Sequence, residues 1–445
     1  MSDPRVRGPN SSSTGWGPVG GLFAANVLFG AGLYAHAFLY NFYLDALGLP
    51  EGVMGLAASF LTAGGLAALV PTGVLVDRRG TRVAYGASAL LGAAGLAAGA
   101  LVREPLAIYL AAFAGGAGTA GWRVSMGPAV MQLTDPSIRS RAFSWNVALL
   151  VGSGAFWVGA AGQVPVWIQE GLGVSRLTGL RVGLVAGAVG TALAGAVFVL
   201  LPGLDGRRRR PVRGTERTAS RGILDGLRIP VHLGLVVALV ALWMTAGGLV
   251  IPFFNLYFLR VHALPVDQIG WLFAGVQVVT ALVLFGSGSI ADRAGTRPTL
   301  FVWILLFAPA LWGLALVGTL ALATVLYLIQ NLVPPATNPL IDQILLEEVP
   351  QERQGAISSW RNGATEISGL VGSAAGGFVL EATGFAVLLG SAGAVGLVGA
   401  VALVLALRRS RSEGVAPVAR GESGAGGTGG GPSVEPALRR SEEGS

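Results

Sequence analysis

Twelve apolar runs, each about long enough to cross a lipid bilayer, occupy most of this chain. A transmembrane helix needs about 20 predominantly apolar residues, whereas a strand of a membrane barrel has about ten and alternates in polarity. The runs lie near 18–45, 52–76, 83–102, 105–132, 142–168, 182–202, 231–258, 267–291, 298–318, 320–346, 356–380 and 384–407. They predict an all-α integral membrane protein with twelve transmembrane helices.

The composition argues against a soluble protein with a large core. Only 12% of the residues are charged, whereas soluble globular proteins are about 25% charged. The chain has no cysteine, so disulfides and thiolate metal sites are excluded. It has three histidines, and neither a Walker-type phosphate loop nor a Ser-His-Asp pattern. We therefore expect a protein that is not an enzyme and has no cofactor or metal.

The basic residues predict the orientation in the membrane. All 30 are arginine, which together with abundant alanine and glycine is typical of a GC-rich bacterial genome. Of these arginines, 24 fall in segments on the same side as the N-terminus, four in loops on the other side, and two within predicted helices. Basic residues concentrate in cytoplasmic loops. We expect a bacterial cytoplasmic membrane protein with both termini inside, and no nucleic-acid partner is needed to explain the net charge of +7.

An arginine-rich segment divides the twelve runs into two groups of six. We expect five regions: a cytoplasmic N-terminal segment (1–17), a six-helix bundle (18–202), a cytoplasmic linker (203–230), a second six-helix bundle (231–407) and a disordered cytoplasmic tail (408–445). The protein is expected to work as a monomer in the lipid bilayer.

The two groups repeat one another. The motif made of Gly73, Asp77, Arg78, Gly80 and Arg82 follows the second run and returns 215 positions later. Its copy consists of Gly288, Asp292, Arg293, Gly295 and Arg297. Similar offsets relate Asn41 to Asn255, Gly55 to Gly270 and Trp145 to Trp360. An internal repeat of this kind is typical of transporters whose halves move around a central site.

Six plus six spans, a basic central loop and this motif after the second span resemble the major facilitator superfamily, over about residues 18–407. The resemblance implies two six-helix bundles and a cytoplasmic gate at the two motif loops. In that gate Asp77 would contact the start of the eleventh helix, near 356–360. We assign Arg361 to the same gate. The alternative is that the motif arginines only set topology.

Ionisable and amide side chains inside the predicted helices are candidate site residues, because they are costly in a membrane and usually face a cavity or a partner. Arg123 in the fourth helix could bind an anionic substrate or pair with a carboxylate. On the tenth helix Asn331, Asn338 and Asp342 share one face, as do Asn362 and Glu366 on the eleventh. The substrate-binding candidates are Tyr34, Asn41, Arg123, Asn255, Asn331, Asn338 and Glu366.

Three residues are candidates for carrying protons. Glu366 is the first, because a carboxyl group that moves between an apolar site and a nearby arginine could take up and release a proton. The alternative is a fixed ion pair of Glu366 with Arg123 or Arg361. Asp342 is the second candidate, although a pair with Arg361 or a gate role suits it better. His36 is the third, and a structural histidine is its alternative.

These features predict a secondary transporter of a small-molecule substrate, with protons as the coupling ion. Efflux of an amphiphilic compound is the first expectation, because the helices carry many aromatic and few charged residues. Uptake of a sugar or a carboxylate is the alternative, and Arg123 supports it. A third possibility is a transporter-like fold that acts as a sensor.

Overall fold

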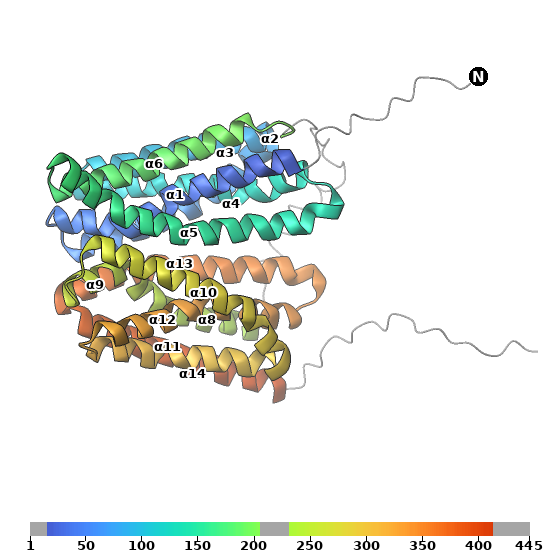
Figure 1. Cartoon of the computed structure of the whole chain (residues 1–445). Coiled ribbons are helices and arrows are strands. Elements are labelled where there is room, and N and C mark those ends of the chain that lie inside the picture. Colours follow the sequence, from blue (N-terminus) through green and yellow to red (C-terminus); the bar gives the residue numbers. More distant parts are fainter. Residues whose placement is uncertain (1–15, 205–230, 413–445) are drawn as a thin grey trace, which may run out of the picture.

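The computed structural model describes residues 16–204 and 231–412, and within them the chain is helical and contains no strand. The predicted linker, the first 15 residues and the end of the tail lie outside the described residues. Figure 1 shows two bundles side by side, one from each half of the chain. The all-α fold of two six-helix bundles is thereby confirmed.

The first bundle consists of α1 (Trp16–Ala46), α2 (Glu51–Arg79), α3 (Thr81–Leu101), α4 (Pro105–Leu133), α5 (Pro136–Leu172) and α6 (Arg176–Leu200). The second consists of α8 (Val231–Val250), the 3-10 turn η1 (Ile251–Phe253), α9 (Phe254–Val261), α10 (Val266–Ala294), α11 (Thr296–Leu316), α12 (Leu320–Glu347), η2 (Gln351–Arg353), α13 (Gln354–Thr383) and α14 (Phe385–Ser412). We call the side on which α6 ends and α8 begins the inner side, and the opposite side the outer side.

Ten of the described helices are long and apolar enough to cross a membrane, with α8 to α9 taken as one span. The two predicted spans that fall short are α4 and α13. Both are rich in glycine and carry polar side chains. These two helices hold Arg123 and Glu366, so the least apolar helices are the ones that carry the candidate site.

The sequence repeat extends to the helix ends. The bounds of α10 and α11 are those of α2 and α3 moved by 215 positions, and α1 stands in the same relation to the segment from α8 to α9. The seventh span is broken where α1 is continuous, because Pro252 lacks the N–H that a continuous helix would use. Gly80 and Gly295 make the sharp turns after α2 and α10 with φ of 90° and 89°, a region that favours glycine.

Two helix pairs join the bundles, α2 with α13 and α5 with α10. Glycines let each pair approach closely, as small residues do in membranes. A Cβ at Gly55 would collide with backbone atoms of Ser373 and Gly377, and the Cα of Gly270 lies against the position that a Cβ at Gly162 would take. The repeat relates Gly55 to Gly270 and Gly162 to Gly377, so the two interfaces have glycines at equivalent positions.

Candidate site between the bundles

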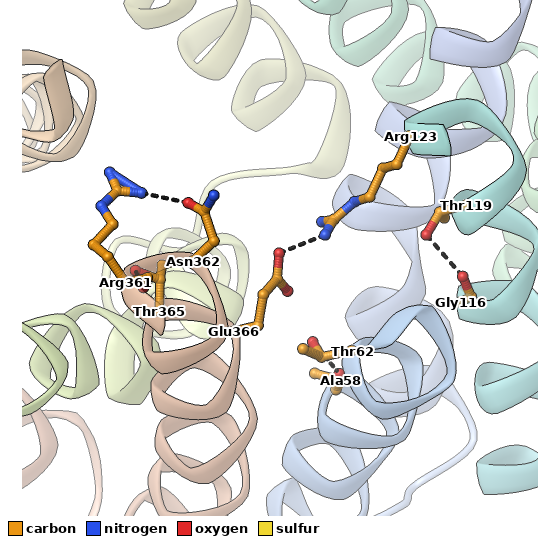
Figure 2. Close-up of polar contacts among 9 residues, drawn as sticks. All are labelled: Ala58, Thr62, Gly116, Thr119, Arg123, Arg361, Asn362, Thr365 and Glu366. Carbon is orange, nitrogen blue, oxygen red and sulfur yellow. Dashed lines mark hydrogen bonds and ion pairs between the residues drawn. The ribbon is translucent and has the colours of Figure 1, made fainter. Parts of the chain in front are cut away.

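An ion pair links the two bundles near the middle of the membrane-length helices. Nη1 of Arg123 on α4 lies 2.5 Å from Oε1 of Glu366 on α13. Figure 2 shows the two side chains pointing toward one another from opposite bundles, with Thr62 of α2 beside them. The sequence predicted both residues as site candidates, and the structure brings them together.

Hydrogen bonds of nearby residues attach the two helices that carry the ion pair to their own bundles. The residue before Arg123 is Trp122, whose indole nitrogen donates to Oδ1 of Asn26 on α1 at 2.7 Å. Asn26 in turn donates to the carbonyl of Asn146 on α5 at 2.5 Å. Two residues after Glu366, the hydroxyl of Ser368 donates to the carbonyl of Ala241 on α8 at 2.8 Å. The backbone that carries each partner is therefore attached to its own bundle.

The ion pair is not enclosed by protein. The side chain of Arg123 is 43% exposed and that of Glu366 is 27% exposed. Both charged groups are therefore partly accessible, and a small molecule that reached them could contact both.

Asp342 has a different partner. Nε of Arg361 lies 3.0 Å from its Oδ1, and Nη2 donates to Oδ2 at 3.3 Å. Nη1 of Arg361 donates to Asn362 at 2.8 Å, and the arginine is buried. Asp342 and Arg361 both belong to the second bundle, so this pair does not link the bundles.

The remaining site candidates inside the bundles lie apart from one another. Tyr34 packs against α5 near Gly154. His36 is buried and stacks on Tyr40, with ring centroids 4.2 Å apart. Asn331 donates to the hydroxyl of Thr280 on α10 at 3.1 Å. Oδ1 of Asn338 is buried without a hydrogen-bond partner among the described residues. Among the residues that the structure describes, no hydrogen bond or ion pair is found between these four side chains and the Arg123–Glu366 pair, and their roles stay predictions.

Asn41 and Asn255 close the outer half of the interface in a symmetrical way. The amide of Asn41 donates to the carbonyl of Pro252 at 2.6 Å. The amide of Asn255 donates to the carbonyl of Phe38 at 2.9 Å. Each asparagine thus binds the backbone of the other bundle, and both are buried. In this state the amide nitrogens of both asparagines donate hydrogen bonds to backbone carbonyls.

A charged cluster at the outer ends of the helices was not predicted from the sequence. We call it the outer clasp (Asp45, Glu51, Arg260 and Glu381). Arg260 at the end of α9 lies 2.6 Å from Asp45 and also pairs with Glu51, both on the first bundle. Glu381 at the end of α13 accepts a hydrogen bond from the backbone N–H of Gly52 at 3.0 Å. Nearby His262 adds no charge at neutral pH, because desolvation lowers its pKa.

The outer clasp could have been found in the sequence by one signal. Asp45 and Arg260 are 215 positions apart, which makes them equivalent positions of the repeat with opposite charges. From the sequence, Arg260 is one of the four arginines of the outer loops and Asp45 has no assigned role, so their pairing is not predicted.

Bonds between described residues of the two bundles are concentrated on the outer side. Besides the outer clasp and the two asparagines, Ser59 donates to Leu370 on α13 at 2.6 Å. On the inner side the indoles of Trp145 and Trp360 are 55% and 39% exposed. The described residues therefore show a state that is closed on the outer side.

The predicted cytoplasmic gate is only partly visible in this state. Asp77 and Arg78 are exposed at the end of α2, as is Arg293 at the end of α10. The side chain of Asp292 and the surroundings of Gly288 lie outside what the structure describes. A contact between Asp77 and α13 belongs to a state closed on the inner side, so it stays a prediction.

Two motif arginines bind within their own bundles. Nη2 of Arg82 donates to the carbonyl of Leu201 at 2.7 Å, at the end of α6. Arg297, its repeat equivalent, donates to the carbonyl of Leu407 on α14 at 3.1 Å and pairs with Glu348. Arg82 thus satisfies a carbonyl at the C-terminal end of α6, a stabilising position for a cation, whereas Leu407 lies before the last turn of α14.

No metal site is formed by the described residues, since they contain no suitable group of three His, Asp or Glu side chains. The candidate site therefore consists of one arginine and one carboxylate from opposite bundles. Such a pair can bind a charged group in exchange for its partner, or exchange a proton.

Among known protein families, the sequence model of the Major Facilitator Superfamily matches residues 233–441 of this chain. No curated protein sequence matches the chain significantly. The crystal structure of a bacterial homolog of the human lysosomal transporter Spinster, inward-facing and occupied, is similar to this chain with a TM-score of 0.74 at 14% identity, over 90% of this chain and 98% of that one.

Two further solved structures share the fold. The nucleoside transporter NupG has a TM-score of 0.70 at 14% identity, over 88% of this chain and 99% of its own. A D-xylose-proton symporter has a TM-score of 0.67 at 14% identity, over 86% and 96%. At this identity the likeness concerns the fold.

Proposed function

Because the chain belongs to the major facilitator superfamily, we propose that it is a proton-coupled secondary transporter. It moves a small organic solute across a bacterial cytoplasmic membrane by alternating access, with both termini inside. The observation that carries this proposal is the ion pair of Arg123 and Glu366, which joins the two bundles and is partly exposed.

Protonation of Glu366 would weaken that link. A partly exposed ion pair contributes about 0.2–1 kcal/mol, which is enough to shift the populations of two states and too little to lock one. A proton on Glu366 removes the attraction to Arg123, and the bundles can then rearrange. Asp342 is a poorer proton carrier for this purpose, because its partner Arg361 lies on the same bundle.

Two directions of transport suit different observations. Efflux of an amphiphilic compound is supported by aromatic residues at the interface, such as Phe38 and Phe273, whose ring centroids lie 5.7 Å apart across the bundles. Uptake of a sugar or a carboxylate is supported by the 43% exposed guanidinium of Arg123. A guanidinium forms paired hydrogen bonds with carboxylates. The exposed arginine therefore favours a carboxylate as the solute, and both directions of transport stay proposals.

Flux measurements in proteoliposomes test the proposal. An imposed pH gradient is expected to drive accumulation of a transported solute, and Glu366→Gln to abolish that dependence. Asp342→Asn is the matched control, since it also removes one carboxylate but should keep the coupling. Proton dependence that survives in Glu366→Gln contradicts the proposal. A protein that binds solutes but moves none would instead be a sensor with this fold.

A further inference from the structure

The two partners of the cross-bundle pair differ in one chemical respect. The guanidinium of Arg123 stays charged in proteins, whereas a carboxylate such as Glu366 can be neutralised by a proton. The pair lies 2.5 Å apart, so a charged solute that binds one partner competes with the other for it. This asymmetry decides which solute charge the site accepts.

A cationic solute is disfavoured by this arrangement. It would bind Glu366 and leave Arg123 beside it as an unpaired cation that cannot lose its charge. Breaking a pair by removing one partner is costly wherever the remaining charge is partly withdrawn from water. A neutral solute does not compete with the pair and leaves the link between the bundles intact.

An anionic solute has a way to avoid this cost. It binds Arg123 and displaces Glu366, and two anions are then side by side. A nearby like charge favours the neutral form of a carboxyl group, so Glu366 takes a proton from solvent. The site then holds Arg123, one anion and a neutral carboxylic acid, and its net charge is zero before and after the exchange.

We infer that the site takes a small monovalent organic anion, a carboxylate being the best fit to the guanidinium, together with one proton on Glu366. This inference rests on the proposed function and names its substrate class. The binding of anion and proton is coupled because both act on the same ion pair, and the coupling is reciprocal. Transport of this kind carries no net charge.

Other ionisable groups near Glu366 are few and do not offer a second route. The helices packed against α13 carry them mainly at their ends: His232 on α8, Glu51, Asp77, Arg78 and Arg79 on α2, Arg408, Arg409 and Arg411 on α14, and Tyr327, Asp342 and Glu347 on α12. Asp342 is held by Arg361. Figure 2 also draws Thr62 of α2, whose hydroxyl donates to the carbonyl of Ala58 on the same helix.

Equilibrium binding to the purified full-length protein in nanodiscs tests the inference without any flux. The probes are lactate, benzoate and indole-3-acetate, each with its neutral amide, and benzylamine as the cation of matched size. Calorimetry in two buffers of different ionisation enthalpy gives the number of protons taken up with each bound probe. Variants Arg123→Gln and Glu366→Gln are compared with Arg176→Gln, which removes an exposed arginine at the start of α6.

At least one carboxylate should bind with uptake of about one proton, while its amide and benzylamine should not compete. Arg123→Gln is expected to weaken binding on the order of tenfold to a hundredfold, the usual effect of losing a charged hydrogen bond. Glu366→Gln should bind the anion at least as tightly but without proton uptake, which a merely structural role would not produce. Arg176→Gln should behave as wild type.

Three results would overturn the inference: equal binding of benzylamine or the amides, carboxylate binding without proton uptake in the wild type, or no binding by any carboxylate. Failure of the proposed function looks different. If the protein binds a carboxylate with one proton but does not move it, the inferred site stands and the proposed transport function fails. If a gradient drives transport of an amine or a neutral solute, the proposed transport function stands and the inference of an anionic solute fails.

Discussion

At the scale of single residues, Arg82 of the motif is expected to stabilise the fold. Arg82 binds the carbonyl at the end of α6, whereas Arg79 is exposed. Replacing Arg82 by Met should lower the free energy of unfolding by about 1–3 kcal/mol, because a helix-end carbonyl loses a charged donor. Thermal unfolding in detergent measures this, with Arg79→Met as the control. Equal stability of the two variants would contradict the role as a helix cap.

The sequence predicted which residues matter inside the membrane better than it predicted their partners. Arg123 and Glu366 were recognisable because charges are rare in apolar helices. That they pair with one another depends on how α4 and α13 approach across two bundles, which periodicity within one helix does not encode. The pairing of Asp45 with Arg260 was not predicted, because charged residues are common at helix ends and these two did not stand out.

At the scale of helices, glycine sets how closely the bundles approach. A side chain at Gly55 would collide with the backbone of α13, whereas nothing lies within 4 Å of a Cβ added at Gly275 on α10. Gly55→Leu should therefore disfavour the outer-closed state, and Gly275→Leu should not. Because the protein has no native cysteine, the labelling rate of a cysteine placed at Ala274, which is buried on α10 and contacts Gly159 of α5 across the interface, reports opening of the outer side. Unchanged labelling in Gly55→Leu would contradict this role.

The repeat allowed the helix order to be predicted, but some helix ends extend beyond the apolar runs. α5 begins at Pro136, six positions before its predicted run, and α6 begins at Arg176. Proline suits the first turn of a helix, and polar first turns can extend out of the apolar layer. Hydropathy measures the apolar layer and not the helix, so it does not detect these turns.

At the scale of the whole molecule, the outer clasp holds one of two states. Its ion pairs are partly exposed, and such pairs contribute about 0.2–1 kcal/mol each. Arg260→Asp should open the outer side, because the carboxylates of the outer clasp (Asp45, Glu51 and Glu381) would then lie near a fourth carboxylate at position 260. The exchange Asp45→Arg with Arg260→Asp should restore part of the closure, since these positions are equivalent in the repeat. Labelling of the same cysteine measures both, and no recovery in the double variant would argue against a direct pair.

The central claim is that this outer-closed state alternates with one closed on the inner side. Two pairs of spin labels in the cysteine-free chain test it by double electron–electron resonance. One pair stands at Arg103 and Gly318 on the outer side, and the other at Ser140 and Gly355 on the inner side. Arg260→Asp should lengthen the outer distance and shorten the inner distance together. If the outer distance changes while the inner distance stays fixed, the bundles do not alternate and the account is contradicted.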